Sequence, residues 1–186
     1  MCFLKSISDD VRFAQLEFRK HTKVKRLVLG CFLACMAAVL QVAGGFLPGI
    51  GYFISPFATL PILIGAMFSL QMGVMSYFLT ILLLFILLPS ELVIFPFTTG
   101  LLGIGIGVAF SFFKKRLSII FIGAILLTIG IMSLLYVFHF TVLGPTVSDS
   151  YSFLTAGSIF IFSFLYNWLW VEMALFFFKK LKTVIT

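Results

Sequence analysis

Charged residues are scarce in this chain of 186 residues: Asp and Glu together number 6, and only 10% of all residues are charged. Soluble domains carry about 25% charged residues. Histidine occurs twice and cysteine three times, and the sequence has no paired carboxylates at a helical spacing, no Cys/His cluster and no Gly-x-Ser-x-Gly motif. These shortages argue against an enzyme, a bound metal and a cofactor.

The chain is correspondingly rich in hydrophobic residues. They make up 62% of the chain, against roughly 45–50% in soluble domains, and Phe alone contributes 25 residues. A water-soluble fold of this size cannot hide that much apolar surface. The sequence therefore predicts an all-α, polytopic integral membrane protein in a lipid bilayer. It excludes soluble enzymes, nucleic-acid-binding modules and disordered tails.

Basic residues are confined to three clusters, each of which flanks an apolar run. Cytoplasmic loops of membrane proteins are rich in Lys and Arg. We therefore expect all three clusters to lie on the cytoplasmic side, in a bacterial plasma-membrane protein with both termini in the cytoplasm. The 13 residues are Lys5, Arg12, Arg19, Lys20, Lys23, Lys25 and Arg26, then Lys114, Lys115 and Arg116, then Lys179, Lys180 and Lys182.

An even number of spans places both termini on the same side of the membrane, and six transmembrane helices also place all three basic clusters there. A spanning helix needs about 20 apolar residues, and clusters of Gly and Pro mark the breaks between spans. An alternative with four spans treats residues 57–88 as a re-entrant hairpin. Residues 1–24 are expected to form a cytoplasmic segment that lies on the membrane surface as a short helix or frays, ahead of a six-helix membrane domain over residues 25–180. The predicted spans are 25–44, 55–70, 74–88, 92–113, 117–140 and 151–178, with a Gly- and Pro-rich loop between the first two spans and a break at 71–73.

Small residues form two stripes at helical spacing. Gly30, Ala34 and Ala38 share one face of the first span, and Gly103 and Gly107 share a face of the fourth. Such stripes let two helices approach closely. The first stripe is predicted to form an outward face that docks to a separate membrane subunit, and packing inside this chain is the alternative. For the second stripe, close packing is expected.

The last span carries most of the polar side chains in the apolar part of the chain. Ser163, Tyr166, Asn167 and Trp170 fall on one helix face, which combines aromatic walls with hydrogen-bonding groups, as ligand sites do. Asn167 lies about 24 Å below the start of this span at 1.5 Å per residue, so it forms either the pocket floor or a clamp between helices. Glu172 is expected to face a partner, a cavity or the basic end of the helix, because a carboxylate at membrane depth is costly.

The outer rim supplies further candidates for ligand binding. Tyr52 and Ser55 lie in the first loop, where they could close over the polar face from outside. Glu91 begins the fourth span, while His139 and Asp149 flank the last outer loop. Solvated loop charges are the competing interpretation for Glu91 and Asp149.

The chain resembles the S components of energy-coupling factor transporters, or uncharacterised bacterial membrane proteins related to them, over about residues 24–180. Those proteins are small and apolar, with six helices and cytoplasmic ends. Their first helix carries an Ala-x-x-x-Ala docking motif, matched here from Ala34 to Ala38, and their first outer loop is a lid, at the place of residues 44–61. The stretches most similar to the family are 55–73 and 99–103.

The resemblance implies a substrate-binding subunit for a vitamin or another micronutrient, without its own ATPase. The partners would be a shared transmembrane coupling subunit with ATPases, a small-molecule substrate and the lipid bilayer. The alternative is a non-transporting scaffold or assembly protein of the cell envelope, similar to the small rod-shape membrane proteins. An intramembrane enzyme is a third class, but the sequence offers neither a nucleophile nor an acid–base pair for it.

Overall fold

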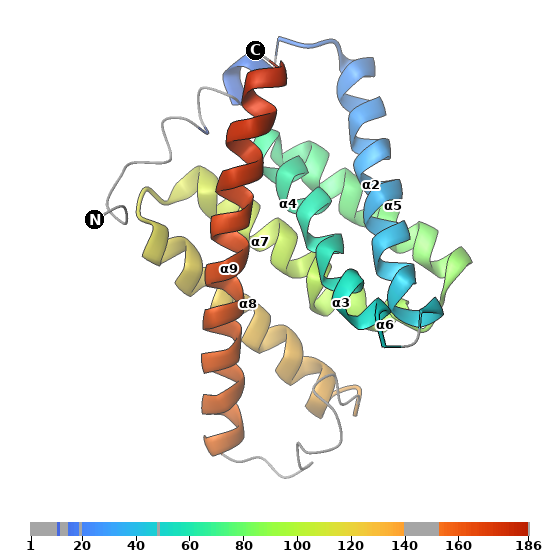
Figure 1. Ribbon diagram of the computed structural model, residues 1–186, viewed down its shortest axis with the longest axis vertical. Helices are drawn as coiled ribbons and strands as arrows, with labels where there is room; N and C mark the ends of the chain where they lie inside the picture. Colours follow the sequence, from blue (N-terminus) through green and yellow to red (C-terminus); the bar gives the residue numbers. More distant parts are fainter. Residues whose placement is uncertain (1–10, 12–14, 19, 48, 140–152, 186) are drawn as a thin grey trace.

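The computed structural model describes residues 11, 15–18, 20–47, 49–139 and 153–185 (Figure 1). Within these residues the chain is helical and has no strand, as the sequence predicts. The helices are α2 (Lys23–Phe46), α3 (Gly51–Ile54), the short 3₁₀ turn η1 (Ser55–Ala58), α4 (Thr59–Phe68), α5 (Leu70–Leu87), α6 (Glu91–Phe97), α7 (Thr99–Phe112), α8 (Arg116–Tyr136) and α9 (Phe153–Ile185).

Six helical stretches of the described chain are long and apolar enough to cross a membrane, which confirms the polytopic architecture. The stretches Gly51–Phe68 and Leu70–Leu87 contain 18 residues each, or about 27 Å of helix. Each is therefore long enough to span by itself, and the re-entrant alternative for residues 57–88 is not needed. The chain breaks between them at Ser69, two residues before the predicted break, where the backbone becomes extended.

The predicted loop between the first two spans is present but shorter than expected. Helix α2 continues to Phe46, and the next helix already begins at Gly51. Gly51 serves a close approach, because a Cβ at this position would lie 2.1 Å from the carbonyl oxygen of Ala43. Pro56 sits at the start of η1, where proline is compatible with a helical turn.

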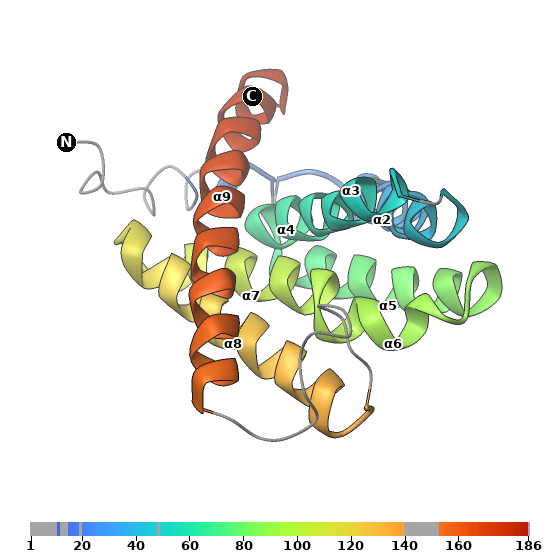
Figure 2. The same ribbon diagram turned by 60° about the horizontal axis from the view of Figure 1, so that its bottom comes forward.

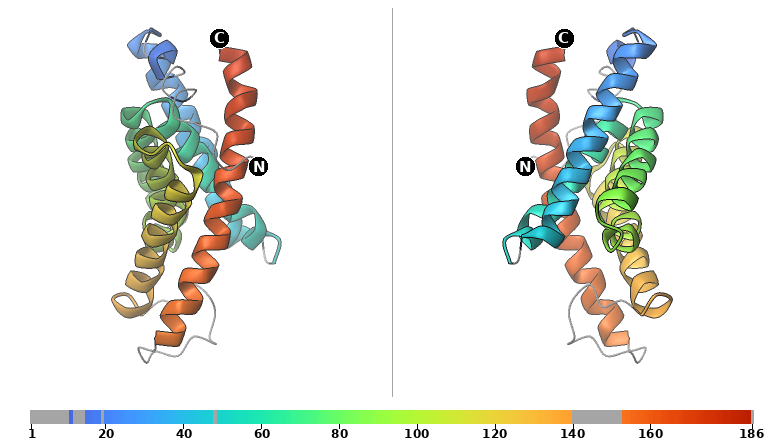
Figure 3. Two further views of the ribbon diagram at one scale, coloured as in Figure 1. Left: turned by 90° about the vertical axis from the view of Figure 1, so that its left-hand side faces the viewer. Right: turned by 90° about the vertical axis from the view of Figure 1, so that its right-hand side faces the viewer.

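The helices form two layers, seen edge-on in Figure 3. One layer contains α2, α4 and α9, and the other contains α5, α7 and α8, with α6 leading into α7 (Figures 2 and 3). Helices α4 and α7 lie at the centres of their layers and pack on each other most extensively. The core therefore runs along the α4–α7 interface.

The predicted close packing of the glycine stripe on α7 is confirmed. A Cβ on Gly107 would lie 2.4 Å from the Cβ of Ala66, and a Cβ on Gly103 would lie 2.9 Å from that of Ile62. Both neighbours belong to α4. The absence of side chains on this face of α7 is what lets the two central helices touch.

The stripe of Gly30, Ala34 and Ala38 lies inside the bundle, so the prediction that it faces outward for docking is wrong. All three residues are buried. The hydroxyl of Ser76 donates to the carbonyl oxygen of Gly30 at 2.9 Å, and that of Thr80 donates to the carbonyl oxygen of Ala34 at 3.3 Å. The stripe is a packing face for α5, which was the alternative interpretation.

The described Lys and Arg residues gather at one end of the bundle, because successive spans alternate in direction. We call this end the basic end. There the rings of Phe18 and Phe178 each lie 5.4 Å from the ring of Phe68, which fixes residues 15–18 against α4 and α9. An ion pair of 2.9 Å joins Arg116 Nη1 to Glu172 Oε1 and so links α8 to α9. Glu172 thus reaches the basic end of the helix, one of the places expected for it.

Candidate functional site

The polar face predicted on α9 points into the bundle. Ser163, Asn167 and Trp170 are almost completely buried, and Tyr166 is partly buried beside them. Asn167 packs against Gly123 of α8, where a Cβ would lie 2.1 Å from the Asn167 side-chain oxygen. Because Trp170 is only 2% exposed, it belongs to the interior of the bundle and not to its surface.

One residue of another helix joins this face. Thr59, the first residue of α4, is fully buried, and the Tyr166 hydroxyl lies close to Thr59 and Trp170. We call the five residues Thr59, Ser163, Tyr166, Asn167 and Trp170 the core polar cluster. The sequence does not predict that Thr59 belongs to this cluster. A threonine in an apolar run usually bonds to its own helix, and the spacing of Thr59 carries no information about its contact with α9.

Within the described residues, four atoms of the core polar cluster make no hydrogen bond of good geometry, although the Tyr166 hydroxyl lies near two of the residues that carry them. The four atoms are Thr59 Oγ1, Ser163 Oγ, Asn167 Oδ1 and Trp170 Nε1. The Asn167 amide nitrogen is satisfied, since it donates to the carbonyl oxygen of Ser163 at 2.7 Å. The unpaired atoms therefore include an obligate donor on Trp170, an acceptor on Asn167 and two hydroxyls that can play either role.

Aromatic rings flank these polar atoms. The Trp170 ring lies 6.0 Å from the Tyr166 ring and 5.8 Å from the Phe57 ring, both in edge-on geometry. The Tyr166 ring stacks on Phe162 at 5.7 Å. The cluster thus combines flat apolar walls with unpaired hydrogen-bonding groups, and its members carry no charge.

A second polar group lies at the end opposite to the basic end. The amide nitrogen of Gln41 donates to Glu91 Oε2 at 2.8 Å, and the hydroxyl of Thr99 donates to the Gln41 side-chain oxygen at 2.9 Å. We call these three residues the rim network. Gln41 was missed although it is the only amide in the first predicted span, which was a usable indication.

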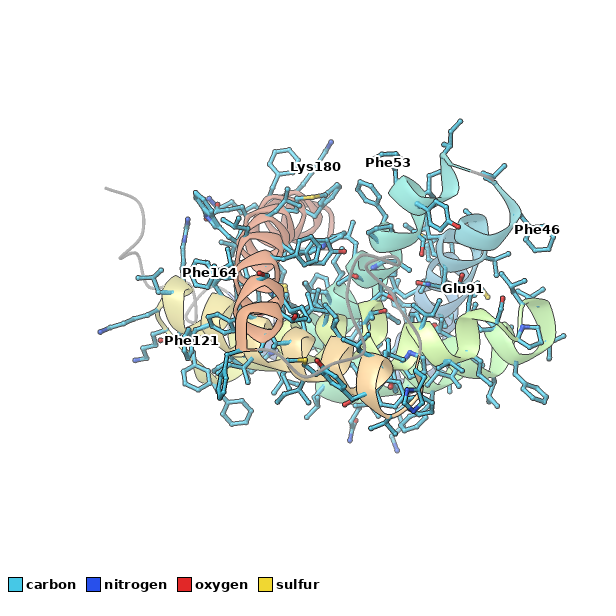
Figure 4. All side chains as sticks on the ribbon, turned by 90° about the horizontal axis from the view of Figure 1, so that it is seen from below. Phe46, Phe53, Glu91, Phe121, Phe164 and Lys180 are labelled. Carbon is cyan, nitrogen blue, oxygen red and sulfur yellow. The ribbon has the colours of Figure 1, made fainter. Side chains whose placement is uncertain are left out.

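The rim candidates do not join the core polar cluster. Tyr52 is 75% exposed, and Ser55 packs against Gly44, near which Glu91 also lies. Figure 4 shows Glu91 beside α2 and α6, well to the side of α9. Glu91 is therefore half-buried and hydrogen-bonded to Gln41, and is not merely a solvated loop charge. His139 is exposed at the end of α8, and Asp149 lies outside the described residues.

No cluster of three or more His, Cys, Asp or Glu side chains forms within the described part of the chain. The arrangement of the core polar cluster supports hydrogen bonding and aromatic stacking. Comparison with known proteins adds no assignment: no family model, no curated protein and no solved structure matches the chain.

Proposed function

We propose that this chain is the membrane-embedded substrate-binding subunit of a bacterial transporter that takes up a vitamin or another micronutrient. The observation that carries the proposal is the set of four unpaired polar atoms buried in the core polar cluster. Lipid offers no hydrogen bonds, so an unpaired polar group within a membrane costs several kcal/mol. A bound small molecule with both donors and acceptors would satisfy these atoms.

The packing of α9 supports access to this cluster. Helix α9 packs extensively on α8 but only sparsely on α4, so Thr59 and Trp170 lie on the two sides of the weaker contact. Separation of α9 from η1 and α4 would open the cluster toward the end opposite to the basic end. With the basic end in the cytoplasm, as the charge distribution favours, the substrate would enter from outside.

The remaining parts of such a transporter would come from other chains. The chain has no phosphate-binding loop, so ATP hydrolysis requires separate ATPases, coupled through a shared transmembrane subunit. Because the small-residue stripe on α2 already packs against α5, that coupling subunit would dock on another face of the bundle.

Mass spectrometry of the purified protein tests the proposal. The full chain is purified in mild detergent after incubation with a cell extract, and small molecules released on denaturation are identified. We expect wild-type protein to retain one low-molecular-weight ligand that Thr59→Val and Asn167→Leu lose. At about 100 times Kd, that ligand should stabilise the wild-type fold by about 2.7 kcal/mol.

Thr128→Val is the matched control, because it removes a partly buried hydroxyl from the neighbouring helix. The Thr128 hydroxyl donates to the carbonyl oxygen of Ala124 at 2.7 Å, so it needs no ligand. Equal ligand retention by Thr59→Val and Thr128→Val would place the substrate elsewhere. Retention of no small molecule by wild-type protein, together with capture of cell-envelope proteins and no ATPases, would favour the scaffold.

A further inference from the structure

A pocket of about 680 Å³ opens at the basic end of the bundle, on the side away from the core polar cluster. It lies among the N-terminal segment, the start of α2, the turn between α4 and α5, and the end of α7. The described residues that line it are Gln15, Arg26, Phe68, Ser69, Leu70, Gln71, Val108, Ser111 and Phe112. These described lining residues include one cation and no carboxylate.

Arg26 provides the positive charge of this pocket. Its Nε atom is buried and has no hydrogen-bond partner among the described residues. Both ion pairs found among the described residues, Lys20–Glu17 and Arg116–Glu172, lie elsewhere. A guanidinium group that lines a cavity without a described carboxylate partner is suited to a phosphate, which it can hold by two parallel hydrogen bonds.

Other donors converge on the same pocket. Gln15 donates to Ser111 Oγ at 2.9 Å and to the carbonyl oxygen of Met67 at 2.9 Å, so the Ser111 hydroxyl keeps its own proton for a ligand. The Ser69 side chain, at the N-cap of α5, makes no capping bond, and α5 has no acidic residue in its first turn. The free backbone N–H groups of this helix start add to the positive potential of Arg26.

The remaining walls are apolar. Phe68, Leu70 and Phe112 give the pocket a hydrophobic side. Basic pockets between membrane helices on the cytoplasmic side are sites for anionic lipid headgroups. An acyl chain attached to a bound phosphate would therefore find apolar contacts beside the charge.

We propose that the pocket at the basic end binds a phosphate group, held by Arg26, Ser111 and the start of α5, and supplied by a phospholipid headgroup or by free phosphate. This site is separate from the core polar cluster and does not depend on the transport proposal. Its expected effect is to fix the N-terminal segment and the α4–α5 turn against α2 and α7.

Native mass spectrometry of the full chain, taken from nanodiscs into detergent, tests this proposal. The nanodiscs contain phosphatidylglycerol or, as a comparison, a diacylglycerol glycolipid that lacks phosphate. Wild-type protein should retain one phosphatidylglycerol and no glycolipid. Loss of the charge in Arg26→Gln should lower the retained fraction by about tenfold or more. Lys25→Gln is the matched control, since it removes the same charge from an exposed neighbour that does not line the pocket.

Two further measurements make the test independent of the folding of the Arg26 variant. Val108→Phe fills the cavity and keeps Arg26, and it should also lose the lipid. Displacement of the lipid by inorganic phosphate would identify the free anion as an alternative occupant, whereas persistence would identify the lipid headgroup. Equal retention in Lys25→Gln, Arg26→Gln and Val108→Phe, or equal retention of the glycolipid, would overturn the proposal.

Discussion

Single polar side chains inside this bundle fall into two energetic groups. Gln41 is buried and bonds to both Glu91 and Thr99, whereas the buried hydroxyls of Thr59 and Ser163 make no hydrogen bond of good geometry to a described residue. Substitution by an apolar residue should therefore have opposite effects on stability in the two groups. A buried polar group that loses its partner costs about 1–3 kcal/mol, while removal of an unpaired group relieves a cost of similar size.

Gln41→Leu should lower the free energy of unfolding by about 1–3 kcal/mol, because it leaves the Glu91 carboxylate and the Thr99 hydroxyl without their partner. Unfolding of the purified protein in mixed micelles, titrated with a denaturing detergent, gives this quantity. In the double variant Gln41→Leu/Thr99→Val the second substitution should cost less than it does alone. Additive effects of the two substitutions would show that they do not interact.

Thr59→Val should raise the free energy of unfolding of ligand-free protein by about 1 kcal/mol or more, since it replaces an unpaired buried hydroxyl with a methyl group of similar size. Ser163→Ala should act in the same direction. The same micelle titration measures both. A loss of stability in both variants would mean that these hydroxyls are satisfied in the folded protein, for example by buried water.

Pairs of helices show which small residues this fold requires. The sequence does not distinguish the glycines of α7 from one another, but the atoms that surround each glycine in the structure differ. A Cβ on Gly107 would meet the Cβ of Ala66 at 2.4 Å and the carbonyl oxygen of Leu63 at 3.1 Å, both fixed on α4. A Cβ on Gly105 would meet Leu126 Cδ1, the end of a flexible side chain.

Gly107→Ala should therefore destabilise the protein, because α7 must move away from α4, whereas Gly105→Ala should be neutral or stabilising. Alanine is favoured over glycine in a helix by about 1 kcal/mol, and this gain is the same at both positions. The difference between their unfolding free energies isolates the helix contact. Equal effects of the two substitutions would show that α4 and α7 are not in close contact at Gly107.

The positions of most helices could be predicted because long apolar runs bounded by charge or proline leave few alternatives. The helical structure after Gly44 could not be predicted, because Gly and Pro usually indicate loops but here both occur in helical segments. Gly51 permits contact with Ala43, and Pro56 starts a helical turn. Spacing also showed that Gly30, Ala34 and Ala38 share a face, but spacing carries no information about which helix covers that face.

At the scale of the whole molecule, the sequence predicts the residues that one helix contributes to the candidate site, but not the residue that comes from a second helix. Periodicity predicts which residues of a single helix share a face, such as Ser163, Asn167 and Trp170. Thr59 contributes from another helix, and its place beside Tyr166 depends on how α4 packs against α9. Periodicity likewise could not separate the rim network from the core polar cluster, because that separation follows from the two-layer arrangement (Figure 3).

The asymmetry of charge along the bundle predicts its orientation in the membrane. The described Lys and Arg residues lie at the basic end, and the opposite end carries Glu91 and exposed aromatic residues such as Tyr52. The positive-inside rule therefore places the basic end in the cytoplasm. In a variant lacking Cys2, Cys31 and Cys35, a membrane-impermeant thiol reagent added to intact cells should label Tyr52→Cys and should label Lys115→Cys only after the cells are opened. Labelling of Lys115→Cys in intact cells, with protection of Tyr52→Cys, would reverse the orientation and would require the substrate to enter from the cytoplasm.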